Sequence, residues 1–145
     1  MTNPTARKFG YPDTLVAETD SWLVLVRPQQ PTLGALVLVC KEPAEAFSDL
    51  SAAAFADLRT AVSQIERVLK DFTAYARINY LMLMMVDRDV HFHVLPRYAE
   101  ARTHGGVSFV DAGWPGPPAL GQAVDLSPAD AAALAKTLGA AWAKA

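Results

Sequence analysis

The chain has 145 residues, of which 52% are apolar and 19% charged, and its formal net charge is −2. This length predicts one domain over 1–145, with a core at about 12–120. The near-neutral charge excludes the clustered basic surface that binds nucleic-acid polymers, although a mononucleotide needs only a few contacts. The single cysteine, Cys40, excludes an internal disulfide. Without a signal-like or membrane-length apolar run, we expect no membrane partner and a cytoplasmic location.

The first half of the chain predicts three strands followed by a long helix. Segments 14–19 and 22–27 are rich in β-forming residues and are separated by a turn signal, and a third apolar strand is expected at 34–41. Ser51 is suited to cap a helix of about 20 residues. Apolar residues follow it at steps of three and four, which predicts one buried helix face: Phe55, Leu58, Val62, Ile65, Leu69 and Phe72.

The second half predicts two further strands and a C-terminal helix at about 128–144. The strands are expected at 77–86 and 89–98, with Asp87-Arg88 as a turn too short for a crossover, so they should pair antiparallel. Ser127-Pro128 is typical of a helix start. We expect residues 1–12 to form a loose arm. The order predicts an α+β domain with helices on one side of a five-stranded antiparallel sheet.

The segment DVHFHVLPRY carries the most informative pattern in the chain. Residues two apart in a strand point to the same face, so Asp89, His91 and His93 should form one row of titratable groups. The apolar residues between them should face the core: Val90, Phe92 and Val94. The pattern therefore predicts reactive side chains on a rigid element with a hydrophobic backing.

Four functions fit this row from the residues alone. The histidines can be ordinary residues on a solvated face, or Asp89, His91 and His93 can hold a metal ion, as in a metallohydrolase. A neutral imidazole can instead attack phosphorus and form a covalent phosphoramidate, helped by donors around the phosphate. The fourth possibility is a phosphate-binding module without turnover, which the spacing does not separate from catalysis.

The same residues resemble the signature of the histidine triad (HIT) superfamily, in which histidines alternate with apolar residues before an LPR-like tail. The segments PQQPTLGALVLVCKEPAEAFSDL and RINYLMLMMVDRDVHFHVLPRY extend the resemblance, and with GWPGPPAL they are most similar to a bacterial branch. The resemblance implies an α+β fold and a homodimer. It also implies hydrolysis or transfer at a nucleotide phosphorus through a nucleotidyl-histidine, with no cofactor and no obligatory metal.

Mapped onto this sequence, the resemblance makes His91 the nucleophile and His93 the phosphate contact. The first triad position holds Asp89 instead of histidine, and its charge can raise the pKa of a neighbouring imidazole. Asp89 is expected to orient an imidazole. This chemistry requires an uncharged His91 ring that is accessible at the edge of a phosphate-sized cleft.

Several family contacts to substrate are missing. Ala35 stands where a histidine often follows the glycine of the third strand, and the phosphate-cradling loop is reduced to Asp87-Arg88. The expected substrate contacts are therefore Arg27, Asn79 and Arg88. The sequence predicts a hydrolase or transferase acting on a nucleoside phosphate or dinucleoside polyphosphate, with a nucleotide-binding protein of little or no catalysis as the alternative.

Overall fold

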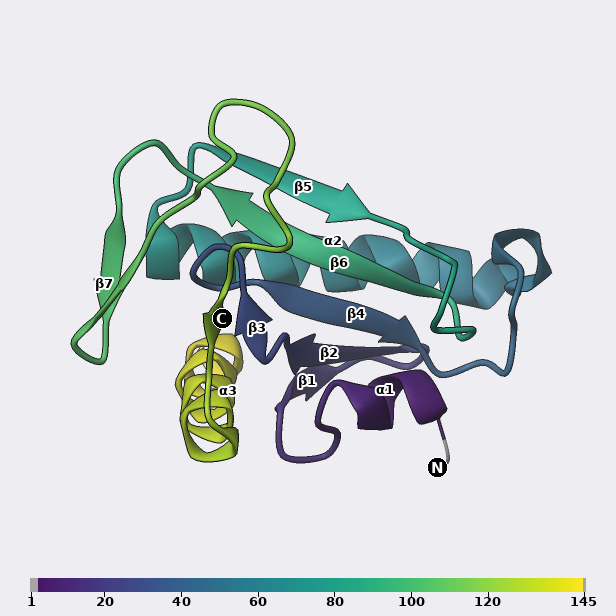
Figure 1. Cartoon of the computed structure of the whole chain (residues 1–145). Helices are drawn as coiled ribbons and strands as arrows, with labels where there is room; N and C mark the ends of the chain where they lie inside the picture. The colour runs from purple at the N-terminus through teal and green to yellow at the C-terminus, as the bar shows by residue number, and fades with distance from the viewer. Residues whose placement is uncertain (1–2, 145) are drawn as a thin grey trace.

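The computed structural model describes residues 3–144 and contains a five-stranded antiparallel sheet (Figure 1). The order across the sheet is β1-β2-β4-β6-β5. The strands are β1 (Leu15–Glu18), β2 (Trp22–Val26), β4 (Leu36–Cys40), β5 (Arg77–Leu81) and β6 (His91–Arg97). This confirms the predicted α+β class and the antiparallel pairing of the last two strands.

Two capped helices cover one face of this sheet. Helix α2 (Ala52–Thr73) begins after Ser51, whose side chain accepts from the Ala54 N–H. Helix α3 (Pro128–Ala143) begins after Ser127, which accepts from the Asp130 N–H in the same way. Both caps were predicted, since serine satisfies a free N–H of the first turn. The two helices share one apolar core with the residues that alternate with the histidines, Val90, Phe92 and Val94.

The opposite face of the sheet, which carries the histidines, is also covered. Helix α1 (Pro4–Lys8) and Phe9 pack there in a second apolar cluster, whose buried members are Ala6, Phe9, Leu23, Leu25, Val37 and Val39. Figure 1 shows α1 in purple across the face opposite α2. The prediction of a loose arm at 1–12 is therefore wrong for residues 3–9. Burial on both faces explains why β2 and β4 are continuous apolar runs without alternation.

The last two sheet strands are shorter than predicted. Strand β5 ends at Leu81 and β6 begins at His91, so residues 82–90 connect them instead of the two-residue turn that we expected. Three apolar side chains of this connection leave the core: Leu83 is 48%, Met85 88% and Val86 78% exposed. The predicted strand therefore ends where its residues no longer have a face to pack on.

Smaller elements occupy the regions outside the main sheet. A short helix, η1 (Phe47–Asp49), precedes α2. Within the loop-rich part of the chain, β3 (Gln29–Gln30) pairs with β9 (Val124–Asp125), and β7 (Arg102–His104) pairs with β8 (Val107–Phe109). None of the helices in residues 3–144 combines the length and apolar character needed to cross a membrane.

Candidate functional site

The two histidines of the motif lie side by side at the beginning of β6. His91 pairs with Val39 and His93 with Val37 of β4, so both imidazoles project from the sheet face that α1 covers. Their ring centroids are 5.2 Å apart, and the rings meet nearly at right angles, at 81°. The strand alternation therefore brings together the two residues that the sequence singled out.

The His91 ring is oriented by main chain. Its Nδ1 lies 2.7 Å from the backbone carbonyl oxygen of Asp89. A carbonyl only accepts, so Nδ1 carries a proton and donates it, and in the neutral ring Nε2 then keeps a free lone pair. This Nε2 atom is buried and has no hydrogen-bond partner among the described residues. In the neutral ring this geometry leaves Nε2 as the nitrogen with nucleophilic character.

His93 is held in the opposite tautomer. The Arg27 Nε–H donates to its Nδ1 at 3.3 Å, and because an arginine only donates, the His93 proton must sit on Nε2. Burial, with contributions from the charge of Arg27 and from His91, lowers the pKa of His93 from 6.5 to about 4. His93 is therefore neutral at physiological pH and presents an Nε2–H donor.

Arg27 follows the end of β2 and is fixed by the turn after it. Its Nη1 donates to the Gln29 carbonyl at 2.8 Å. The buried Gln30 amide donates to the Arg27 and Ala35 carbonyls and accepts from the Gly34 N–H. Burial also lowers the pKa of the Arg27 guanidinium. These bonds hold the turn around Arg27 and keep its guanidinium beside His93. The guanidinium can therefore set the tautomer of the His93 ring.

We expect the His93 ring to make stability pH-dependent between about pH 6.5 and pH 4. In this window His93 binds a proton in the unfolded chain but not in the folded chain, so the free energy of unfolding falls as the pH is lowered. The measurement is urea unfolding at pH 7 and pH 5, with His93→Gln as the control that flattens this part of the dependence. Arg27→Gln should raise the His93 pKa in an NMR titration. A His93 that titrates near pH 6.5 in the wild type would contradict this account of its burial.

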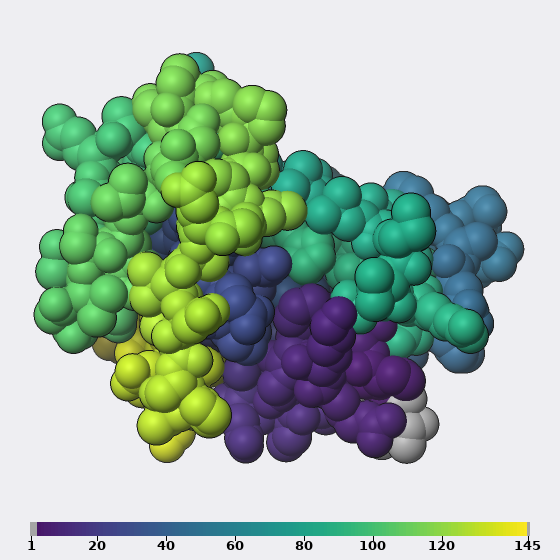
Figure 2. Space-filling view, in the orientation of Figure 1, coloured from purple at the N-terminus to yellow at the C-terminus, as the bar shows by residue number. Residues whose placement is uncertain are grey.

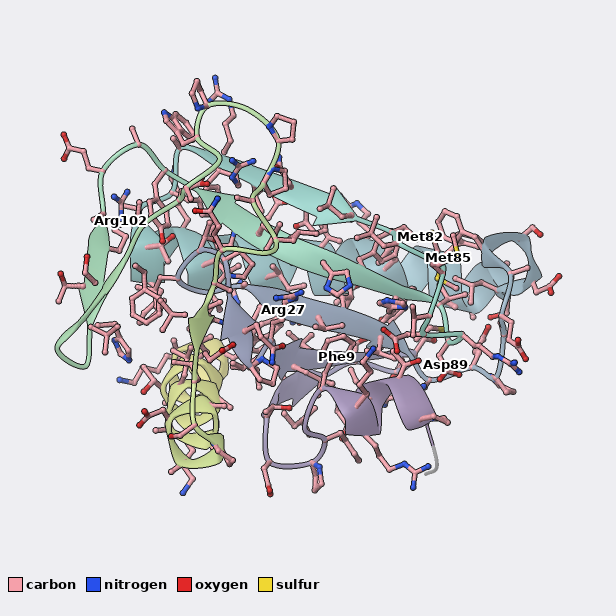
Figure 3. All side chains as sticks on the ribbon, in the orientation of Figure 1. Phe9, Arg27, Met82, Met85, Asp89 and Arg102 are labelled. Atoms are coloured by element: carbon pink, nitrogen blue, oxygen red, sulfur yellow. The ribbon has the colours of Figure 1, made fainter. Side chains whose placement is uncertain are left out.

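The expectation that the His91 ring is accessible is wrong for this conformation. His91 has 0% exposure and His93 has 6%. Phe9 covers both rings, with centroids 6.4 Å from His91 and 5.6 Å from His93. Figure 3 places Phe9 and Arg27 on the face of the sheet that carries α1. The imidazoles are therefore closed off by the N-terminal segment.

The remaining residues of the expected site lie apart from the two imidazoles. The Asp89 carboxylate accepts from the Thr5 backbone N–H at 3.2 Å, so only its carbonyl serves His91. Asn79 of β5, which pairs with Leu95 of β6, accepts a hydrogen bond from Arg97 Nη1 at 2.8 Å. Arg88 is exposed in the 82–90 connection. Within residues 3–144, no three His, Cys, Asp or Glu side chains are gathered to hold a metal ion.

This fold and this pair of histidines define a class of protein. The model of the HIT domain family matches residues 8–100, so the chain belongs to the HIT family. A comparison with curated proteins finds no significant match.

Among solved structures, the chain is similar to a histidine triad protein of Bradyrhizobium japonicum, with 20% identity, a TM-score of 0.72, and coverage of 99% of this chain and 96% of that chain. A second similar structure is a histidine triad protein of Sinorhizobium meliloti, with 19% identity, a TM-score of 0.72, and coverage of 99% and 95%. The diadenosine triphosphate hydrolase of Plasmodium falciparum is 10% identical, with a TM-score of 0.68 and coverage of 89% and 76%.

Sequence reasoning missed the residues that cover the site. Thr5 and Lys8 lie in a helix of five residues and Phe9 directly follows it, and such a helix is too short to show an apolar period. One available signal was the unbroken apolar run of β2 and of β4, which indicates strands buried on both faces. Those runs require some segment to lie over the histidine face.

Proposed function

We propose that this protein catalyses metal-independent hydrolysis or transfer at a phosphorus of a nucleoside phosphate or dinucleoside polyphosphate, through a covalent intermediate on His91. The observation that carries the proposal is the pair of opposite tautomers. His91 has a lone pair on Nε2 because Asp89 holds its Nδ1–H, and His93 has a proton on Nε2 because Arg27 occupies its Nδ1. His91 is thus prepared to attack phosphorus, and His93 is prepared to donate a hydrogen bond.

The proposed reaction has two displacements at phosphorus. The His91 Nε2 lone pair forms the P–N bond as the P–O bond to the leaving group breaks, and the leaving group departs with that electron pair. Water or another acceptor hydroxyl then attacks phosphorus, the P–N bond breaks, and its electrons return to Nε2 while the acceptor loses its proton to solvent. Two displacements divide one difficult step into two easier ones.

The surrounding groups are proposed to stabilise charge during both steps. The Asp89 carbonyl, 2.7 Å from Nδ1, stabilises the imidazolium character of the phosphorylated ring. The His93 Nε2–H donates to a non-bridging phosphate oxygen, and a fixed donor of this kind contributes about 2.7–4 kcal/mol to the transition state. The family's first triad histidine is thus replaceable by Asp89, since a main-chain atom does the orienting.

Three polar side chains are proposed to bind the rest of the substrate. Arg27 is the nearest cation to His93 and is the proposed phosphate contact. Arg88 precedes β6 and is proposed to meet a phosphate tail. Asn79 is proposed to contribute its amide N–H groups, because its oxygen already accepts from Arg97. The similarity to a diadenosine triphosphate hydrolase supports including dinucleoside polyphosphates among the substrates.

The test is to trap the intermediate. The protein is incubated in chelator with nucleotides labelled at the α-phosphorus, denatured in alkali, and examined for label on the His91 peptide. We expect a labelled adduct that is stable in alkali and lost in acid. Turnover that chelator abolishes would instead favour the metallohydrolase, which would have to recruit the Asp89 carboxylate from its contact with Thr5.

The complete burial of His91 favours a second candidate function, nucleotide binding with little or no catalysis. A binding protein needs only a conformation that admits the nucleotide, whereas catalysis also needs the phosphorus at Nε2. Thermal shifts with a panel of nucleotides would detect binding, because a ligand that binds only the folded state raises its stability. A thermal shift without any adduct would support this second candidate.

We also propose that the protein acts as a cytoplasmic homodimer. Strand β5 is an edge of the sheet, and the connection after it exposes Leu83, Met85 and Val86, so this edge is suited to pair with another copy. Light scattering should give twice the chain mass. Leu83→Lys combined with Met85→Lys should give a monomer, whereas Val110→Lys, at an apolar residue exposed elsewhere, should not. A wild-type monomer at all concentrations would contradict the dimer.

A further inference from the structure

We propose that a hollow beside Trp114 binds the second nucleoside of a dinucleoside polyphosphate, the one that departs with the leaving group. The hollow has a volume of about 510 Å³ and is lined among others by Arg77, Asn79, Arg97 and Trp114. The inference rests on the proposed function and selects, among its substrates, the molecules that carry two nucleosides. Binding in the hollow is measured apart from catalysis, so either proposal can fail without the other.

The hollow lies on the sheet face that carries the histidines. His93 and Arg97 are four residues apart in β6, so their side chains share one face, about 13 Å apart along the strand. Residues directly opposite in an antiparallel pair also share a face, and on β5 these are Leu81 beside His93 and Arg77 beside Arg97. Leu81 and Asn79 are half-buried and Arg77 is exposed. This strip of β5 therefore leads over the surface from His93 to the hollow.

A tight turn in the loop between β8 and β9 carries Trp114. The Trp114 N–H donates to the Asp111 carbonyl at 3.2 Å, and the Gly116 N–H donates to the Gly113 carbonyl at 2.7 Å. A Cβ at Gly113 would collide with the Pro117 carbonyl oxygen, so the turn requires glycine there. Figure 2 shows this loop in light green on the same side of the molecule as α1, in purple.

The buried Arg97 fastens this turn to the end of β6. Its Nη2 donates to the Gly116 carbonyl at 2.9 Å, and its Nε and Nη2 both donate to the Asp111 carboxylate. The indole of Trp114 is therefore carried by a turn that is fixed at both ends. A site of this kind loses little conformational freedom when a ligand binds.

The hollow contains one positive charge that no carboxylate neutralises. Within residues 3–144, the exposed Arg77 guanidinium makes no ion pair and donates only to the neighbouring Ala76 carbonyl. Arg97, in contrast, is paired with Asp111. The Asn79 oxygen already accepts from Arg97, so the N–H groups of this amide are left to donate. The hollow therefore favours an anionic ligand with hydrogen-bond acceptors.

These side chains match the parts of a nucleoside phosphate. An indole stacks on a nucleobase, and this stacking accepts any base because every base has a π face. The planar guanidinium of Arg77 binds two phosphate oxygens at once. With the reacting phosphorus at His91, the bridging phosphates follow the β5 strip and the second nucleoside reaches Trp114.

The experiment measures the binding of diadenosine triphosphate and of adenosine monophosphate by calorimetry. The full-length His91→Gln protein is used as the parent, so that turnover does not remove the ligand. Arg77→Gln and Trp114→Leu in this parent should each weaken binding of diadenosine triphosphate at least about fivefold. Binding of adenosine monophosphate, which has no second nucleoside, should stay unchanged.

Two control variants separate recognition from folding. Arg59→Gln is the matched control for Arg77→Gln, because Arg59 is an exposed arginine on α2, and it should leave both affinities unchanged. Trp114→Phe keeps a ring that stacks and should retain most of the affinity. Arg77→Gln alters only an exposed side chain, so it tests the hollow even if Trp114→Leu fails to fold. Equal affinity for diadenosine triphosphate in the parent, Arg77→Gln and Trp114→Leu, or no binding at all, would overturn the proposal.

Turnover with otherwise wild-type protein separates this proposal from the proposed function. A labelled adduct on His91, with KM for diadenosine triphosphate raised in both Arg77→Gln and Trp114→Leu, supports both. Binding that depends on Arg77 and Trp114, without any adduct, supports the hollow and refutes the covalent mechanism. An adduct with the wild-type KM in both variants refutes the hollow and leaves the mechanism standing.

Discussion

His91→Gln is expected to lower nucleotide turnover by at least about 10³-fold and to eliminate the labelled adduct. Removing a nucleophile removes the whole covalent route, and losses of this size or greater are typical for such groups. The glutamine amide keeps a polar side chain near the Asp89 carbonyl but offers no imidazole lone pair. Single-turnover measurement of phosphorus–oxygen cleavage gives the rate, and a thermal melt verifies that the variant is folded.

The controls for this prediction are the other histidine and the other triad position. His104, on β7 against Phe72, should tolerate glutamine without loss of turnover. Asp89→Asn should lose less than about tenfold, because the carbonyl that holds His91 remains. A loss in Asp89→Asn as large as in His91→Gln would assign the orientation to the carboxylate, against the geometry.

The degenerate first position of the triad has a simple physical explanation. The contact that fixes the His91 tautomer uses an atom that every residue possesses, so the side chain at 89 is free to change. In this chain it is an aspartate that accepts from a backbone N–H of α1. The same substitution that weakens the family signature in the sequence thus adds a contact that closes the site.

The sequence predicted those parts of the fold that local patterns determine. The apolar period after Ser51 and the Ser127-Pro128 start defined α2 and α3 to within one or two residues. The alternation around the histidines correctly placed Val90, Phe92 and Val94 in the core. It also placed His91 and His93 on one face, where their rings lie adjacent.

The rest of the site depends on contacts between distant parts of the chain. The bond between Thr5 and Asp89 joins residues 84 positions apart, and Arg27 reaches His93 across 66. A five-residue helix carries no periodic signal, so the packing of α1 and Phe9 over His91 could not be predicted from their own residues. The position of Arg27 beside an imidazole depends on the hydrogen bond from the Gln30 amide to the Arg27 carbonyl, and no sequence motif predicts this bond.

Breaking the buried ion pair between Arg97 and Asp111 is expected to be the most destabilising single polar change outside the site. Arg97 Nε lies 2.7 Å from Asp111 Oδ2, and the side chains are 5% and 1% exposed. The guanidinium also donates to Asn79 and to the Gly116 carbonyl, and the Tyr98 N–H donates to Asp111. The pair therefore fastens the loop-rich segment after β6 to the end of that strand.

Asp111→Ala or Arg97→Ala should each lower the free energy of unfolding by about 3–5 kcal/mol, because either change leaves a buried charge without its partner. Urea unfolding gives the values, and Glu18→Gln, which breaks the exposed pair with Lys41, should cost at most about 1 kcal/mol. Replacing both partners, as Arg97→Met with Asp111→Leu, should cost less than the sum of the single changes, since no unpaired charge remains. If Asp111→Ala costs no more than Glu18→Gln, solvent must reach the pair, and the segment after β6 is then held by its other contacts, among them the β3–β9 pairing and the bonds from Arg102 to the Thr73 and Ala74 carbonyls.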